Sequence, residues 1–130
     1  MLTQSLVSVI FEAEEPIEKP VAVTINQETG KLKPCLATEK FIGIAMPGME
    51  PDVTTLRTKP TTGPVVVIHK GIAKVTVMSG TYKKGTPLRV VPRHPRGYLD
   101  VAANEGDTVV AYAAEDAVVE DGDVITVFII

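Results

Sequence analysis

The sequence predicts an all-β fold: a compact small barrel or sandwich that forms a single domain over residues 1–130. Three observations favour it. Apolar residues alternate at period two in several segments, turns rich in glycine and proline separate these segments, and one hairpin-plus-strand unit occurs twice. A chain that is 45% hydrophobic and 22% charged can bury one core. Aromatic residues make up only 5% and Trp is absent, so the core must be mainly aliphatic.

The predicted strands follow one another along the whole chain. Period-two alternation marks 7–11, 21–24, 74–77 and 124–129, and the apolar run 64–68 adds a further strand. Val, Ile and Thr predominate in these segments, and β-branched side chains favour a pleated surface. Turn glycines separate the strands at Gly30, Gly48, Gly80, Gly85, Gly97, Gly106 and Gly122. The segment 113–118 is the single helix candidate, so we expect at most one short helix.

The N-terminal segment 1–11 is apolar but does not match a signal peptide, because no cation precedes its apolar run and Glu12 follows it at once. We interpret it as a possible N-terminal arm that adds a strand to a neighbour's sheet. An integral core strand is the alternative. On the first interpretation, its partner-binding residues are Leu2, Leu6, Val9 and Phe11.

Segments 19–45 and 86–113 share one plan. Each opens a strand at a proline, turns at a glycine and returns from a leucine, and the same offset separates the pairs Pro20–Pro87, Gly30–Gly97 and Leu32–Leu99. An apolar strand follows each copy after a loop. The sequence therefore predicts an internally duplicated hairpin-plus-strand unit whose two copies bury their apolar faces together.

Residues 46–63 are expected to form a long loop that contacts a partner, because connections of this length in small domains are usually functional or mobile. Met46, Met49 and Arg57 are its candidate contact residues. Arg93 belongs to a locally basic stretch in the middle of the chain, which could meet an acidic partner surface. The alternative is that these basic residues lie on exposed turns and only increase solubility.

No pattern of catalytic or metal-binding residues emerges. His69 and His94 are the two histidines, and neither has a cysteine or an acidic pair at ligand spacing, so we expect no metal site. Asp121 and Asp123 lack the remaining ligands of a calcium loop. No nucleophile stands beside a base and no phosphate-binding glycine loop occurs. We expect no enzyme and no cofactor.

The net charge and the hydropathy of the chain argue against nucleic-acid and membrane partners. The net charge of −3 is unsuited to nucleic acid, which requires a basic surface. No segment approaches the roughly 18 apolar residues that span a bilayer, so no membrane partner is expected. The one cysteine, Cys35, cannot form an internal disulfide, which is typical of a protein made in a cytoplasm.

Four stretches resemble a known family: "SLVSVIFEAEEPIEKPVAV", "GKLKPCLATEKFIGIAM", "VVVIHKGIAKVTVMSGTYKKGTPLRV" and "GDTVVAYAAEDAVVEDGDVITVFII". Together they cover nearly the whole chain. Their glycines and apolar strands are similar to those of small phage head decoration proteins, also called capsid cement proteins and often catalogued as a domain of unknown function. This chain differs from the family in its longer 46–63 segment and its proline-rich turn at 92–95.

The resemblance implies a non-enzymatic structural function. Such a protein would bind the outer surface of the expanded phage head as a homotrimer and stabilise contacts between capsomers formed by the major capsid protein. It would be made in the host cytoplasm and located on the capsid exterior of the virion. The alternatives are a small ligand- or carbohydrate-binding β module, a small barrel hydrolase, and a structural subunit of a tail or head-completion ring. The shortage of aromatic platforms disfavours the carbohydrate module.

Overall fold

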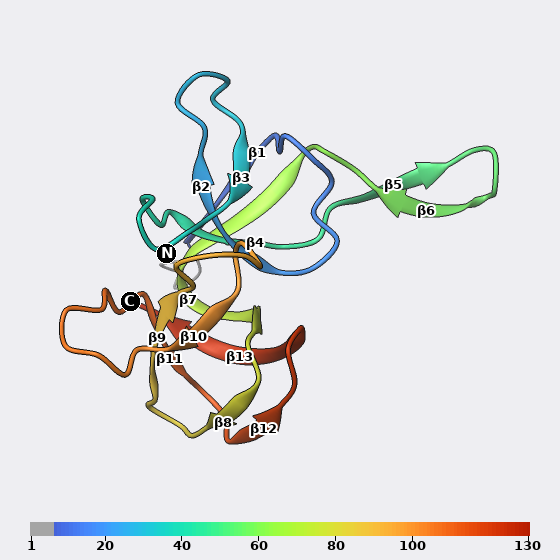
Figure 1. The fold of residues 1–130 in the computed structure, drawn as a ribbon. Helices are drawn as coiled ribbons and strands as arrows, with labels where there is room; N and C mark the ends of the chain where they lie inside the picture. Colours follow the sequence, from blue (N-terminus) through green and yellow to red (C-terminus); the bar gives the residue numbers. More distant parts are fainter. Residues whose placement is uncertain (1–6) are drawn as a thin grey trace, which may run out of the picture.

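The structure is a computed structural model that describes residues 7–130, and within this range it contains strands and no helix (Figure 1). The strands are β1 (Val7–Phe11), β2 (Val21–Ile25), β3 (Leu32–Pro34), β4 (Gly43–Ala45), β5 (Met49–Asp52), β6 (Arg57–Pro60), β7 (Val65–Val77), β8 (Gly80–Tyr82), β9 (Pro87–Val90), β10 (Leu99–Val101), β11 (Ala111–Ala113), β12 (Ala117–Val119) and β13 (Asp123–Ile129). The predicted all-β fold is confirmed. The segment 113–118, predicted as the helix candidate, is not helical. Ala113 is the last residue of β11 and Ala117 is the first residue of β12.

The long strand β7 belongs to two groups of strands, which we call the first and second units. The second half of β7 pairs with β13, and the order continues through β11, β9 and β10. A parallel pairing of Leu99 with Val77 joins β10 back to β7, so the second unit is a closed five-stranded barrel. Closure leaves this barrel without an open sheet edge between its strands.

The first unit repeats this connectivity. The first half of β7 pairs with β1 on one side and β4 on the other, and the order continues through β2 to β3. A parallel bridge between Ala13 and Leu32 then joins β3 to the segment directly after β1. Leu32 and Leu99 therefore occupy the same place in the two units, as the sequence offset predicts. The duplication extends to the pairing order of five strands.

Each unit has its own core. The first core contains Ala13, Ile17, Val21, Val23, Leu32, Ala45, Val65 and Val67. The second contains Ala73, Val75, Val77, Tyr82, Leu88, Val90, Leu99, Val110, Ala111, Ala113, Ile125, Val127 and Ile129, together with Ala22, Cys35 and Ile44 from the first unit. Because side chains alternate along a strand, β2 and β4 pack one face into each core.

Hydrogen bonds connect the two units. Gly97 accepts a bond from the Ala22 N–H at 2.8 Å and donates its own N–H to the Cys35 carbonyl at 2.8 Å. The Thr76 hydroxyl donates to the Pro20 carbonyl at 2.8 Å. Thr76 and Cys35 are fully buried, so these bonds lie in an interior from which water is excluded.

Two pairs of strands stand apart from the two units. The hairpin β5–β6 projects from the first unit, at the right of Figure 1, and β8 pairs with β12 at the end of the second unit. β5 and β6 together precede the last strand of the first unit, whereas β8 directly follows β7 and only β12 precedes the last strand, β13, of the second unit. The segment 46–63, predicted as a long loop, thus forms a hairpin over most of its length. The Thr61 N–H donates to the Gly48 carbonyl at its base (3.0 Å).

Residues 7–11, predicted to be part of an arm or a core strand, form β1 and pair antiparallel with β7 along their whole length. For these residues the structure agrees with the second interpretation, an integral strand, because their backbone groups form hydrogen bonds with β7 of the same chain. Phe11 is half-buried against the first core. Residues 1–6 lie outside the range that the structure describes.

Candidate partner-binding surfaces

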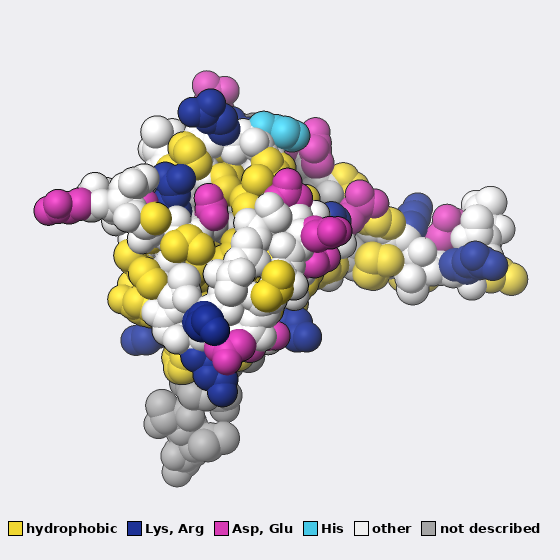
Figure 2. Space-filling model, turned by 60° about the horizontal axis from the view of Figure 1, so that its bottom comes forward, with side chains coloured by type: hydrophobic (Ala, Val, Ile, Leu, Met, Phe, Trp, Pro, Cys, Tyr) yellow, Lys and Arg dark blue, Asp and Glu magenta, His cyan; other side chains and the backbone are white. Residues whose placement is uncertain are grey.

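The β5–β6 hairpin, which we call the arm, forms a two-stranded sheet of its own among residues 7–130. Its two four-residue strands extend it by roughly 13 Å at the usual rise of about 3.3 Å per residue. Figure 2 shows it standing clear of the body, with a hydrophobic side chain at its far end. Pro51 and Pro60 interrupt its edges, and proline at an edge discourages pairing with further strands. The arm is therefore suited to contact through side chains.

The tip of the arm holds two aliphatic side chains in water. Val53 is 86% exposed and Leu56 is 90% exposed. The turn beneath them is ordered by bonds to Asp52, whose carbonyl accepts from the Leu56 N–H (2.8 Å) and whose carboxylate accepts from the Thr54 N–H (3.0 Å). The Thr54 bond is the main reason why the pKa of Asp52 lies below its ordinary value. Leu56 has φ +59, a left-handed conformation that is unfavourable for leucine.

A second exposed apolar surface runs across the outside of the barrel that the second unit forms. Ile72 on β7 lies opposite Phe128 on β13, and Phe128 lies opposite Tyr112 on β11. We call these three residues the apolar row. Their exposed fractions are 60%, 52% and 38%, respectively. Because directly opposed residues on neighbouring strands are in contact, the row is continuous and spans two strand spacings, or about 10 Å.

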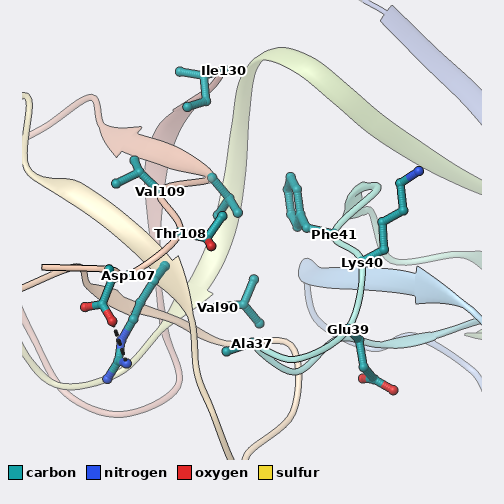
Figure 3. Close-up of a pocket in the computed structure, with 12 residues that line it drawn as sticks. Ala37, Glu39, Lys40, Phe41, Val90, Asp107, Thr108, Val109 and Ile130 are labelled. Atoms are coloured by element: carbon teal, nitrogen blue, oxygen red, sulfur yellow. Dashed lines mark hydrogen bonds and ion pairs between the residues drawn. The ribbon is translucent and has the colours of Figure 1, made fainter. Parts of the chain in front are cut away.

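A cleft of about 490 Å³ opens between the two units. One wall is the segment 37–41 of the first unit, and the other is formed by 106–110 and Ile130 of the second. In Figure 3 the side chains of Phe41 and Val90 point into the space, whereas the charged end of Lys40 turns outward. The cleft is therefore lined by apolar and charged side chains together, because the part-buried ion pair of Arg89 with Asp107 (3.4 Å) also belongs to its wall.

Glu39, also at the rim, is held by several groups. Its carboxylate accepts bonds from Lys33 (2.9 Å), Arg96 (3.0 Å) and the Leu36 N–H (2.9 Å). Burial favours the neutral carboxyl, but these bonds outweigh it and lower the pKa of Glu39. Beneath it, burial and then the Glu39 charge raise the pKa of the Cys35 thiol to about 12. Cys35 is thus protonated at neutral pH and is a poor nucleophile.

The predicted contact residues fall in different places. Met49, 52% exposed, and exposed Arg57 lie on the arm, and Met46 is half-buried next to the arm's base. Arg93 lies on an exposed turn of the second unit and not on the arm. Phe11 packs on the first core. Leu2 and Leu6 precede the described range, and Val9 is described only as part of β1.

The apolar row and the arm tip were missed by the sequence analysis. The signal for the row was present in β13, where Val124 and Phe128 add apolar side chains to the set of alternating positions that does not face the barrel interior. Ile72 is the matching outward residue on β7. The signal for the tip was weaker: Val53 and Leu56 flank two threonines, a pattern that does not distinguish an exposed turn from a short strand.

The described residues bring together no obvious catalytic constellation. No group of three His, Cys, Asp or Glu side chains within 7–130 is placed to hold a metal ion. His94 is exposed and His69 half-buried on β7. The same range contains no helix long and apolar enough to cross a membrane.

Comparisons with known proteins do not add to this picture: no family model matches the chain, and no match was found among curated proteins.

Proposed function

We propose that this protein is a non-enzymatic capsid decoration protein that binds the outside of an expanded phage head and stabilises contacts between capsomers. The observation that carries the proposal is the apolar row on the barrel of the second unit. Three adjacent strands present large apolar side chains outward, and soluble domains seldom leave such a surface without a partner.

The rest of the body supports a mechanical role. The units share β7, and buried hydrogen bonds cross between them, so a load applied to one unit is transmitted to the other. A protein that holds capsomers together needs this stiffness more than it needs a deep site. Repetition of a modest contact around a symmetric shell supplies avidity without one strong site.

The proposal assigns the row to the shell-facing surface, with the major capsid protein as partner and a homotrimer as the binding form. Aromatic residues are enriched among those that dominate binding energy at protein interfaces. Phe128 at the centre of the row and Tyr112 beside it fit that pattern. Truncating the central residues should therefore weaken binding more than truncating an isolated apolar residue elsewhere.

The test uses expanded, emptied heads of the phage whose genome encodes the chain. Purified protein is mixed with these heads and sedimented, and the bound fraction is measured over a range of concentrations. The wild type should bind saturably, and the double variant Ile72→Ser/Phe128→Ser should bind at least roughly tenfold more weakly, as expected when a central aromatic residue and its apolar neighbour are lost from an interface. Cryo-electron microscopy of the decorated heads should place the density at three-fold positions.

Val118→Ser is the matched control, because Val118 is 83% exposed on β12 and lies outside the row. It should bind like the wild type. Failure of the wild-type protein to bind the heads would refute the proposed function. Binding of the wild type that is unaffected by the double variant would instead refute the assignment of the row.

A further inference from the structure

We infer that the arm tip binds an apolar pocket, with a carboxylate at its rim, on the capsid protein of the capsomer next to the one that the apolar row contacts. The row anchors the body on one capsomer and the arm makes the bridge to the other. The inference rests on the proposed function and deepens it, because it assigns the stabilising contact to named residues: Val53, Leu56 and Arg57.

The turn at the arm tip holds a leucine where the backbone favours another residue. Leu56 has φ +59, a conformation that asparagine or glycine adopts at a lower cost. Its side chain is 90% exposed, so contacts with the described part of the chain offset little of that cost. The turn is nevertheless fixed, because the Asp52 carbonyl and carboxylate accept bonds from the Leu56 and Thr54 N–H groups. Strain that a chain retains without an internal gain is characteristic of contact sites.

The side chains at the tip specify the chemistry of the surface that they fit. Val53 and Leu56 are aliphatic and almost wholly in water. Arg57 follows directly, is exposed, and forms no ion pair with another of the described residues. Arginine is enriched at protein interfaces, where it pairs with carboxylates. An apolar pocket with a carboxylate at its rim therefore fits all three side chains.

The tip and the row lie on different parts of the molecule. The row is carried by β7, β13 and β11 of the second unit. The arm leaves the first unit, reaches roughly 13 Å beyond it at the usual rise per residue, and points away from β11 and β13 (Figure 1). A body seated by its row therefore places the tip outside its own footprint. At the positions where capsomers meet, the surface beyond that footprint belongs to the neighbouring capsomer.

A contact of this kind explains how binding stabilises the shell. A bound protein stabilises one state only when it binds that state more tightly than the competing state. Through the row alone, the protein would bind assembled and released capsid subunits equally well. The tip contact forms only where two capsomers adjoin, so it makes binding depend on the assembled shell.

The test measures binding and stabilisation separately on the expanded, emptied heads. The tip variant Val53→Ser/Leu56→Asn removes both aliphatic side chains. Both positions are exposed and asparagine tolerates the left-handed conformation, so the free protein should stay folded, which circular dichroism checks. Sedimentation gives the bound fraction, and scanning calorimetry gives the temperature at which the heads come apart. Val118→Ser is the matched control, because it shortens an exposed valine outside the arm and the row.

The wild type and Val118→Ser should raise the disruption temperature of the heads. At saturating concentration the tip variant should bind to the same stoichiometry but leave that temperature at the value for undecorated heads. Arg57→Glu should reduce the rise, because its charge repels the carboxylate of the pocket, and an undiminished rise would overturn the acidic rim.

The remaining outcomes separate the inference from the proposed function. A tip variant that stabilises the heads like the wild type would overturn the inference and leave the proposed function standing. A tip variant that no longer binds at saturating concentration would make the tip the anchor instead of the bridge, and would also overturn the inference. A wild type that does not bind, or that binds without raising the disruption temperature, would refute the proposed function and the inference with it.

Discussion

At the residue scale, two glycines with the same place in the two units have different reasons to be glycine. Gly30 and Gly97 both have positive φ, +71 and +81, in the turn of the repeated hairpin. A Cβ on Gly30 would meet nothing within 4 Å. A Cβ on Gly97 would lie 2.8 Å from the Val21 Cβ and 3.0 Å from the Ala22 carbonyl oxygen. Conformation alone requires the first glycine, whereas conformation and close packing both require the second.

We therefore predict that Gly30→Ala lowers the free energy of unfolding by about 1 kcal/mol, the cost of a left-handed alanine. Gly97→Ala should lower it by more than about 3 kcal/mol, because overpacking at a buried junction adds to that conformational cost. Urea unfolding of the two variants beside the wild type measures both values. Equal losses would contradict the enclosed position of Gly97.

The sequence offset pairs these two glycines correctly as hairpin turns, because turn chemistry is local. It does not predict that replacing Gly97 by alanine lowers the free energy of unfolding more than replacing Gly30 does. The atoms that enclose Gly97 belong to β2 and β3 of the other unit, and that contact arises only when the units pack. Local patterns therefore predict the conformation of a residue better than they predict its tertiary neighbours.

At the element scale, the arm is structurally independent of the body that carries it. Within the described residues its strands form a ladder with each other and with no other strand, and the Thr61 N–H already bonds to the Gly48 carbonyl where the arm leaves the body. We predict that replacing 49–60 by a two-residue Asn-Gly turn leaves a folded protein whose melting temperature is within a few degrees of the wild type. Circular dichroism melting checks this. A large loss of stability would mean that the arm contributes to the core.

The elements also show where sequence patterns are insufficient. Segments 64–68 and 74–77 were predicted as separate strands, because glycine usually marks a turn between strands. The structure has one strand, β7, that passes through Gly71 at φ +97 and serves both units. For 46–63, prolines and hydroxyl residues indicated a loop, and the hairpin pairing of Met49 with Pro60 was not predictable from such a weak pattern.

At the scale of the whole molecule, the duplicated units differ from two domains joined by a linker. The connection between them is a core strand: Val67 of β7 is buried in the first core, and Val75 of the same strand is buried in the second. Ala22 and Ile44 of the first unit are buried in the second core. Neither unit can expose its side of this junction without losing part of its own interior.

The last prediction follows from that shared interior: the molecule should unfold in one cooperative transition. In differential scanning calorimetry the calorimetric and van't Hoff enthalpies should agree, because two-state unfolding requires that no unit melts alone. Gly97→Ala, which strains the junction, should move this single transition to lower temperature without splitting it. Two resolved transitions, in the wild type or in the variant, would mean that the units are separate folding domains. The stiffness on which the proposed mechanical role depends would then be lost at β7, where a load must pass from one unit to the other.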